Sequence, residues 1–133
     1  MTGEYNLQKL LSSMSPKLIV GEFVFVSIKG AVYGDHARLE PIAMVVESEG
    51  LTLVISRANA DQGSLSYQTV FKCIALEVHS SLDAVGLTAA FSTKLGQCGI
   101  SANVIAGYFH DHIFVQAEYA DKAVAALVEL SQQ

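Results

Sequence analysis

The order of hydrophobic segments in this sequence repeats at a spacing of 60 positions. Each half contains a strand-like segment, a tight turn, a second strand-like segment and a helix that opens with Ala-Asp. The aligned segments are Met44-Val45-Val46 with Val104-Ile105-Ala106, Leu53-Val54-Ile55 with Ile113-Phe114-Val115, and Ala60-Asp61 with Ala120-Asp121. The shared order predicts two copies of one small supersecondary unit. Chance similarity between short hydrophobic strands is the alternative.

Hydrophobic periodicity predicts the elements around this repeat. Apolar residues at steps of three and four indicate helices over about 4–14 and 84–98, and over a last stripe between Ala120 and Val128. A short helix is expected near 58–63, and Gly99 stands where a helix C-terminus favours a left-handed residue. Residues 29–41 contain two glycines and a proline and are expected to form a loop. Strands are expected at 22–28, 71–79, 101–108 and 113–118, with a hairpin over 42–56.

These elements predict an α+β fold of two ferredoxin-like βαββα units, with helices on one face of a mainly antiparallel sheet. The expected units are residues 1–68, with an extra N-terminal helix and no long first helix, and residues 69–133. The second unit has no fourth strand of its own. We expect the first copy to supply it, with 22–28 as the candidate because this strand is apolar on both faces, or a second chain to pair at the exposed edge.

Composition narrows the class of partner. The chain has 133 residues, 51% of them hydrophobic, with a net charge of −5 and no run of Lys or Arg. This argues against nucleic acid and anionic membranes as main partners. The apolar segment around residues 18–28 is interrupted by Glu22 and is too short to span a bilayer. The polar N-terminus is no signal peptide, and two cysteines without a CxxC motif predict a reducing cytoplasm.

The segment 74–115 resembles the ACT domain, a regulatory module that binds small molecules. It carries a strand that ends in a polar turn with Asp83 and Gly86, a helix with Leu87 near its start, Gly99-Ile100 followed by Asn103, and then a hairpin. The resemblance covers about 70–130 well and 15–65 more loosely. The whole chain is similar to short bacterial proteins of two ACT-like units and to tandem-ACT amino-acid sensors of animals. The missing helix of the first unit argues against a ligand site there.

The resemblance implies an amino-acid site at an interface between units. The expected ligand-binding residues are Ser80, Ser81, Leu82, Asp83, Val85, Gly86, Leu87, Asn103, Val104 and Ile105. A helix N-terminus suits a carboxylate, Gly86 allows close backbone approach, and Asp83 could hold an α-ammonium group. The alternative is structural: Asp83 or Ser81 caps the helix, and Gly86 relieves a crowded turn.

The sequence Gly107–Val115 holds a His-Asp-His motif, and His110 and His112 would share one face of a regular strand. A structural zinc site needs four ligands and a catalytic one usually three, yet no other His or Cys has matching spacing. The equivalent turn of the first copy is Ser48-Glu49-Gly50. We therefore interpret the motif as a hairpin turn with solvated imidazoles and expect no metal. Tyr108 and His110 could instead line an interface pocket.

The sequence shows little that indicates an enzyme. His79, Ser80, Ser81 and Asp83 include the residue types of a catalytic triad, but such close neighbours rarely converge correctly. There is no phosphate loop or dinucleotide motif, and Cys98 falls on a buried helix stripe. We expect a cytoplasmic homodimer that binds an amino acid or a similar metabolite, needs no cofactor and acts through a partner protein. The alternative is a structural or interaction module without a metabolite, and a small hydrolase or metal protein comes third.

Overall fold

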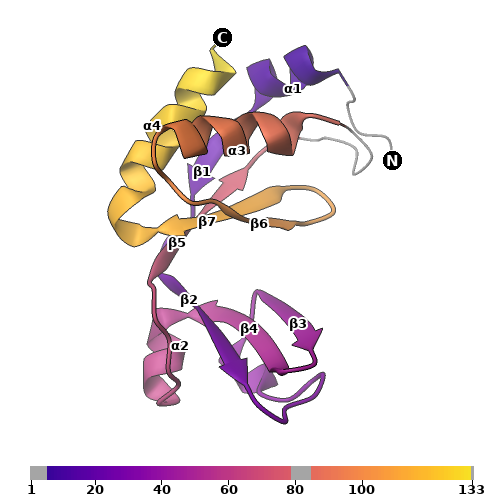
Figure 1. Ribbon diagram of the computed structural model, residues 1–133, viewed down its shortest axis with the longest axis vertical. Coiled ribbons are helices and arrows are strands. Elements are labelled where there is room, and N and C mark those ends of the chain that lie inside the picture. The colour runs from indigo at the N-terminus through magenta and orange to yellow at the C-terminus, as the bar shows by residue number, and fades with distance from the viewer. Residues whose placement is uncertain (1–5, 79–84, 133) are drawn as a thin grey trace. The chain divides into compact units, whose positions relative to one another are not determined.

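The computed structural model describes residues 6–78 and 85–132. Its α-helices are α1 (Leu7–Ser13), α2 (Arg57–Gln62), α3 (Leu87–Gln97) and α4 (Ala120–Ser131), with short 3₁₀ turns η1 (Ala37–Leu39) and η2 (Ala117–Tyr119). Its strands are β1 (Pro16–Leu18), β2 (Phe23–Ile28), β3 (Ala43–Glu47), β4 (Gly50–Ser56), β5 (Phe71–Leu76), β6 (Asn103–Ala106) and β7 (Asp111–Gln116) (Figure 1). No helix among these residues combines the length and apolarity needed to cross a membrane.

Packing divides the chain into two units, and their boundaries differ from those of a single cut near the middle of the sequence. Residues 21–71 form one unit, here called the continuous unit, and residues 1–20 with 72–133 form the other, here called the split unit. The expected boundary at 68/69 lies close to the second crossing of the chain. The first crossing, at 20/21, has no counterpart in the expected division, because α1 and β1 pack with the C-terminal half.

The continuous unit is a three-stranded antiparallel sheet in the order β3-β4-β2. On the far edge of β2, Phe23 pairs with Phe71, and the Phe25 and Phe71 rings meet edge to face at 5.3 Å. A core of aliphatic residues lies against α2 and η1; it consists of Val24, Val26, Leu39, Leu51, Leu53, Ile55 and Ala60. The 29–41 segment, expected to be a loop, contains the single turn η1 in place of a long helix.

The 60-position repeat is present in the strand register. Met44 pairs with Leu53 in the first hairpin, and Val104 pairs with Ile113 in the second. The helix that follows each hairpin has a buried alanine at the equivalent position, Ala60 in α2 and Ala120 in α4. Two copies of one hairpin-helix motif therefore exist in the folded chain, in the register that the repeat predicts.

The split unit takes its fourth strand from the N-terminal part of the chain. Its strand order is β1-β5-β7-β6, and β1 runs antiparallel to β5, with Pro16 opposite Leu76 and Leu18 opposite Ile74. The first half of the chain supplies this strand, as expected, but the strand is 16–18 and not 22–28. Three residues that begin with proline carry no alternation, so the sequence pattern could not identify β1.

The helices of the split unit share one core with its strands. The same faces of β5 and β7 present Ile74, Leu76, Ile113 and Val115 to α1, α3 and α4. In Figure 1, α3 and α4 lie together over this part of the sheet. Gly99 is left-handed, and the Ile100 N–H donates to the Leu95 carbonyl, which closes α3 as expected. The fold class is thus α+β, with antiparallel sheet and helices packed on it.

Candidate functional site

Gly86 determines how the chain enters α3. It is the N-cap residue, with φ 107° and ψ −22°, and its carbonyl accepts from the Ala90 N–H at 2.9 Å. This left-handed conformation strains any residue with a Cβ, so glycine is required here for a backbone reason. A Cβ at this position would also lie 3.2 Å from Cδ2 of Leu7. Gly86 is therefore held by α1 on one side.

The first turn of α3 contains backbone donors that the helix itself does not use. The N–H groups at the start of an α-helix have no acceptor within the helix, and they lie at the positive end of its dipole. Gly86 has no side chain with which to cap them. Leu87 is buried in the core, whereas Val85 is 85% exposed. The arrangement suits an anionic group such as a carboxylate.

The second expected set of residues lies on β6, which is the last strand in the order β1-β5-β7-β6. Its outer edge pairs with no strand among the described residues. Asn103 is exposed, and its Nδ2 donates to the Phe114 carbonyl at 3.4 Å, while Val104 and Ile105 are half-buried. β6 therefore offers free backbone groups for a ligand or for another strand.

Four expected site residues, Ser80, Ser81, Leu82 and Asp83, lie outside the described residues, as does His79. The structure brings Val85, Gly86 and Leu87 together at the start of α3 and places Asn103, Val104 and Ile105 on the edge strand of the same unit. Their joint role in binding stays a prediction.

The His-Asp-His motif lies at the β6–β7 hairpin. The Gly107 N–H donates to the His110 carbonyl at 2.9 Å, so His110 belongs to the turn, whereas His112 pairs with Ile105 inside β7. Loss of hydration raises the pKa of the Asp111 carboxyl, and the neighbouring His112 acts in the opposite direction. No three His, Cys, Asp or Glu side chains gather as a metal site within 6–78 and 85–132.

Neither cysteine has the surroundings of an activated nucleophile. Cys73 is 2% exposed on β5, and burial raises the pKa of its thiol to about 11. A reactive cysteine needs a lowered pKa and access to solvent. Cys98 is half-buried and packs against the core of the split unit, as expected for a structural thiol.

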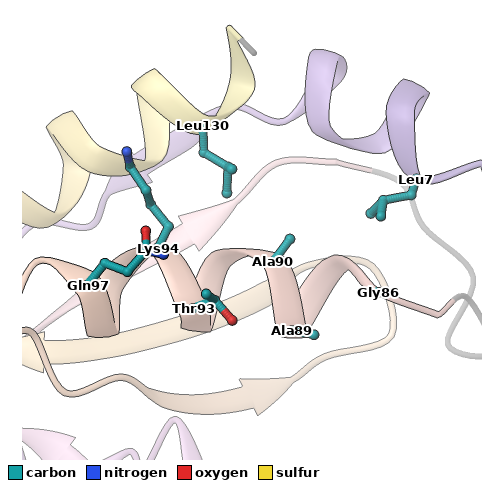
Figure 2. A pocket seen from close by; sticks show the side chains of 8 residues that line it. All are labelled: Leu7, Gly86, Ala89, Ala90, Thr93, Lys94, Gln97 and Leu130. Carbon is teal, nitrogen blue, oxygen red and sulfur yellow. The ribbon is translucent and has the colours of Figure 1, made fainter.

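A groove of about 510 Å³ runs along the solvent side of α3. Figure 2 shows Leu7 of α1 and Leu130 of α4 on one side of it, above the α3 face. The α3 residues in the groove are Gly86, Ala89, Ala90, Thr93, Lys94 and Gln97. At its polar part, Lys94 Nζ donates to Glu129 Oε1 at 2.7 Å. The continuous unit has a smaller depression of about 320 Å³ beside Arg38, Asn59 and Gln62.

Sequence reasoning missed this groove. The core stripe of the 84–98 helix, through Leu87, Phe91 and Leu95, carries the periodic pattern, and the opposite face does not. The available indication was the run of small residues on that face, at Gly86, Ala89 and Ala90. The two leucines that wall the groove come from distant parts of the chain, so no local pattern indicates them.

Comparison with known families gives two adjacent matches. One sequence model of the ACT domain matches residues 2–72, and another matches residues 68–129. Together they confirm the expected resemblance over both halves of the chain, including the more divergent first half. No curated protein sequence gives a significant match.

Several solved structures have a similar fold. A protein of unknown function from Vibrio cholerae, described as a possible transport protein, has 55% sequence identity and a TM-score of 0.86, over 94% of this chain and 95% of that one. The ligand-free regulatory subunit of aspartate kinase from Thermus thermophilus has 10% identity and a TM-score of 0.61, over 86% and 95%. Aspartate kinase from Clostridium acetobutylicum has 12% identity and a TM-score of 0.66, over 88% of this chain and 34% of the enzyme.

Proposed function

Because the chain belongs to the ACT domain family, whose members are regulatory modules for small molecules, we propose that it binds an amino acid or a similar metabolite and passes this signal to a partner protein. Both family models that match are ACT domains, and a tandem of ACT units supports a regulatory role and not a catalytic one. The Thermus relative is itself named a regulatory subunit.

The observation that carries the proposal is the entry into α3. Gly86 opens the helix in a left-handed conformation, and it has no side chain that could cap the first N–H groups of α3. These donors suit the carboxylate of an amino acid. In the proposed site, Asp83 holds the α-ammonium group, and the backbone of Asn103–Ile105 contacts the rest of the ligand.

Assembly would complete the site. We propose a homodimer in the cytoplasm in which the outer edge of β6 pairs with the same edge of a second copy, because an edge strand with free backbone groups favours such pairing. The ligand then acts by differential binding: it stabilises the arrangement in which it contacts both copies and shifts that population. The output is the exposure or burial of a surface that the partner protein recognises.

A thermal-shift screen against the twenty amino acids tests the proposal. At about a hundredfold excess over its Kd, a ligand adds about 2.7 kcal/mol to the free energy of unfolding. This should raise the melting temperature by several degrees. Asp83→Ala should reduce that shift and leave the fold intact. An unchanged shift would remove Asp83 from the site, and no shift from any amino acid at millimolar concentration would contradict the proposal.

A second candidate function has its own support. Exposed apolar side chains lie on the edge strand β3, at Val45 and Val46, and at the tip of the β6–β7 hairpin, at Tyr108 and Phe109. The Tyr108 and Phe109 rings stack edge to face at 5.1 Å. Such surfaces favour a protein-interaction module without a metabolite. In that case, binding of a partner would not depend on any amino acid added to the assay.

A further inference from the structure

We propose that the groove along α3 is a second binding site, for a small aliphatic carboxylate. The site lies on the helical side of the split unit, between α3 and the helices α1 and α4. It shares only Gly86 with the proposed amino-acid site and goes beyond that function. Three features carry the inference: the distribution of apolar and polar side chains, the surroundings of Lys94, and the small size of the side chains on the α3 face.

The groove is apolar toward the start of α3 and polar toward its end. Leu7 and Leu130 stand over Ala90, as Figure 2 shows, whereas Ala89 lines the groove from the other side of α3 and Lys94 lies one turn beyond Ala90. The four residues from Ala90 to Lys94 correspond to a rise of about 6 Å. A molecule with a short hydrocarbon tail and an acidic end matches this order over that length.

Lys94 supplies the charge that selects an anion. Its side chain is only 15% exposed, so its stem is covered and its ammonium group is held beside the groove. Its partner Glu129 is 66% exposed and can turn into solvent. Because Glu129 keeps most of its contact with water, the carboxylate of a ligand can replace it beside Lys94. The ligand adds apolar contacts that Glu129 does not make.

The floor of the groove is open because its side chains are small. Ala89 is exposed, and Ala89 and Ala90, which line the apolar end of the groove, each carry only a methyl group. A larger residue at position 89 would occupy part of the groove without entering the core. A substitution at position 89 can therefore test binding in the groove while α3 stays folded.

The probe is hexanoate, with hexylamine as the matched amine, titrated into the full chain and followed by ¹H–¹⁵N NMR shifts of α3. We expect saturable shifts at Ala89, Ala90 and Lys94 with hexanoate and much weaker ones with hexylamine. Equal binding of the amine would overturn the selectivity for a carboxylate. Shifts confined to the 85–87 and 103–105 backbone would assign hexanoate to the proposed amino-acid site and also overturn the second site.

Two pairs of variants test the lining. Ala89→Leu should abolish hexanoate binding, whereas Thr88→Leu, on an exposed position outside the groove, should leave it unchanged. Leucine is a strong helix former, so both proteins should keep α3. Lys94→Met should weaken binding strongly, and Glu129→Gln should strengthen it by up to about fivefold, because the competing carboxylate is gone. Wild-type affinity in Ala89→Leu or Lys94→Met would overturn the site.

The two sites are separate if Ala89→Leu no longer binds hexanoate but an amino acid still raises its melting temperature as it does for wild type. Failure of the amino-acid screen together with normal hexanoate binding would refute only the proposed function.

Discussion

The Leu7 side chain of α1 packs directly on Gly86, the residue that opens α3. Cδ2 of Leu7 lies 3.2 Å from the point where a Cβ on Gly86 would stand. The N-terminal helix thus covers the beginning of the helix to which the candidate ligand site belongs. Residues 79 positions apart in sequence meet because α1 packs in the split unit.

Gly86→Ala should destabilise the protein by about 1–2 kcal/mol, because φ at this position is 107° and alanine is strained there. The crowding against Leu7 adds to this cost. Gly96→Ala is the matched control within α3, since nothing lies within 4 Å of its Cβ position and its φ is not positive. It should stabilise the protein by about 0.5–1 kcal/mol. Urea unfolding measures both, and equal effects would contradict this account.

Leu10→Ala should destabilise the split unit by about 2–5 kcal/mol, because Leu10 is fully buried in the core that contains α3 and α4. Hydrogen exchange should therefore accelerate at amides of α3 and α4 and change less in β2–β4 of the continuous unit. Lys9→Ala, on the exposed face of α1, is the control. Faster exchange mainly in β2–β4 would instead favour a division of the chain at 68/69.

The Cys73 thiol should make stability fall between about pH 9 and pH 11. Burial raises its pKa from the usual 9.0 to about 11, so in this range the unfolded chain loses a proton that the folded chain keeps. The stabilisation is fully present below pH 9 and disappears as pH rises through 11. Other groups titrate here too, so the measurement is the difference between wild type and Cys73→Ala. A difference independent of pH would contradict the prediction.

Ile105→Lys should weaken the proposed homodimer by placing a charge on the β6 edge. Val45→Lys, at the equivalent position of β3 in the 60-residue repeat, should leave the dimer intact. Light scattering after size exclusion over a dilution series gives the mass. A mass of one chain for wild type at tens of micromolar would refute the dimer. Dissociation by Val45→Lys alone would move the interface to β3.

Much of the fold could be predicted from the sequence, since its elements depend on local patterns. The two hairpins, the long helix and the α4 stripe appear at the expected places, with end positions that differ by a few residues. The left-handed Gly99 at the end of α3 was also expected. These features follow from hydrophobic periodicity and from glycine's freedom, which a short window of sequence contains.

The candidate site could be predicted only in part. The resemblance to the ACT family indicated the start of α3 and the strand 103–106, and the geometry of Gly86 agrees with a backbone role. The groove was not predicted, because Leu7, Lys94 and Leu130 belong to three different helices. Their proximity depends on how α1 and α4 pack on α3, and each residue alone resembles an ordinary surface or core position.

The sequence by itself determined that the chain forms two copies of an antiparallel hairpin-helix motif, because burial of alternate residues specifies strands and their register. Only the tertiary structure decided which segment completes each sheet. β1 has three residues and no pattern of its own, and it pairs with β5 because α1 buries Leu10 and Met14 in the split-unit core. The pairing of β1 with β5 depends on contacts between segments that are distant in the sequence, and a local sequence pattern carries no information about such contacts.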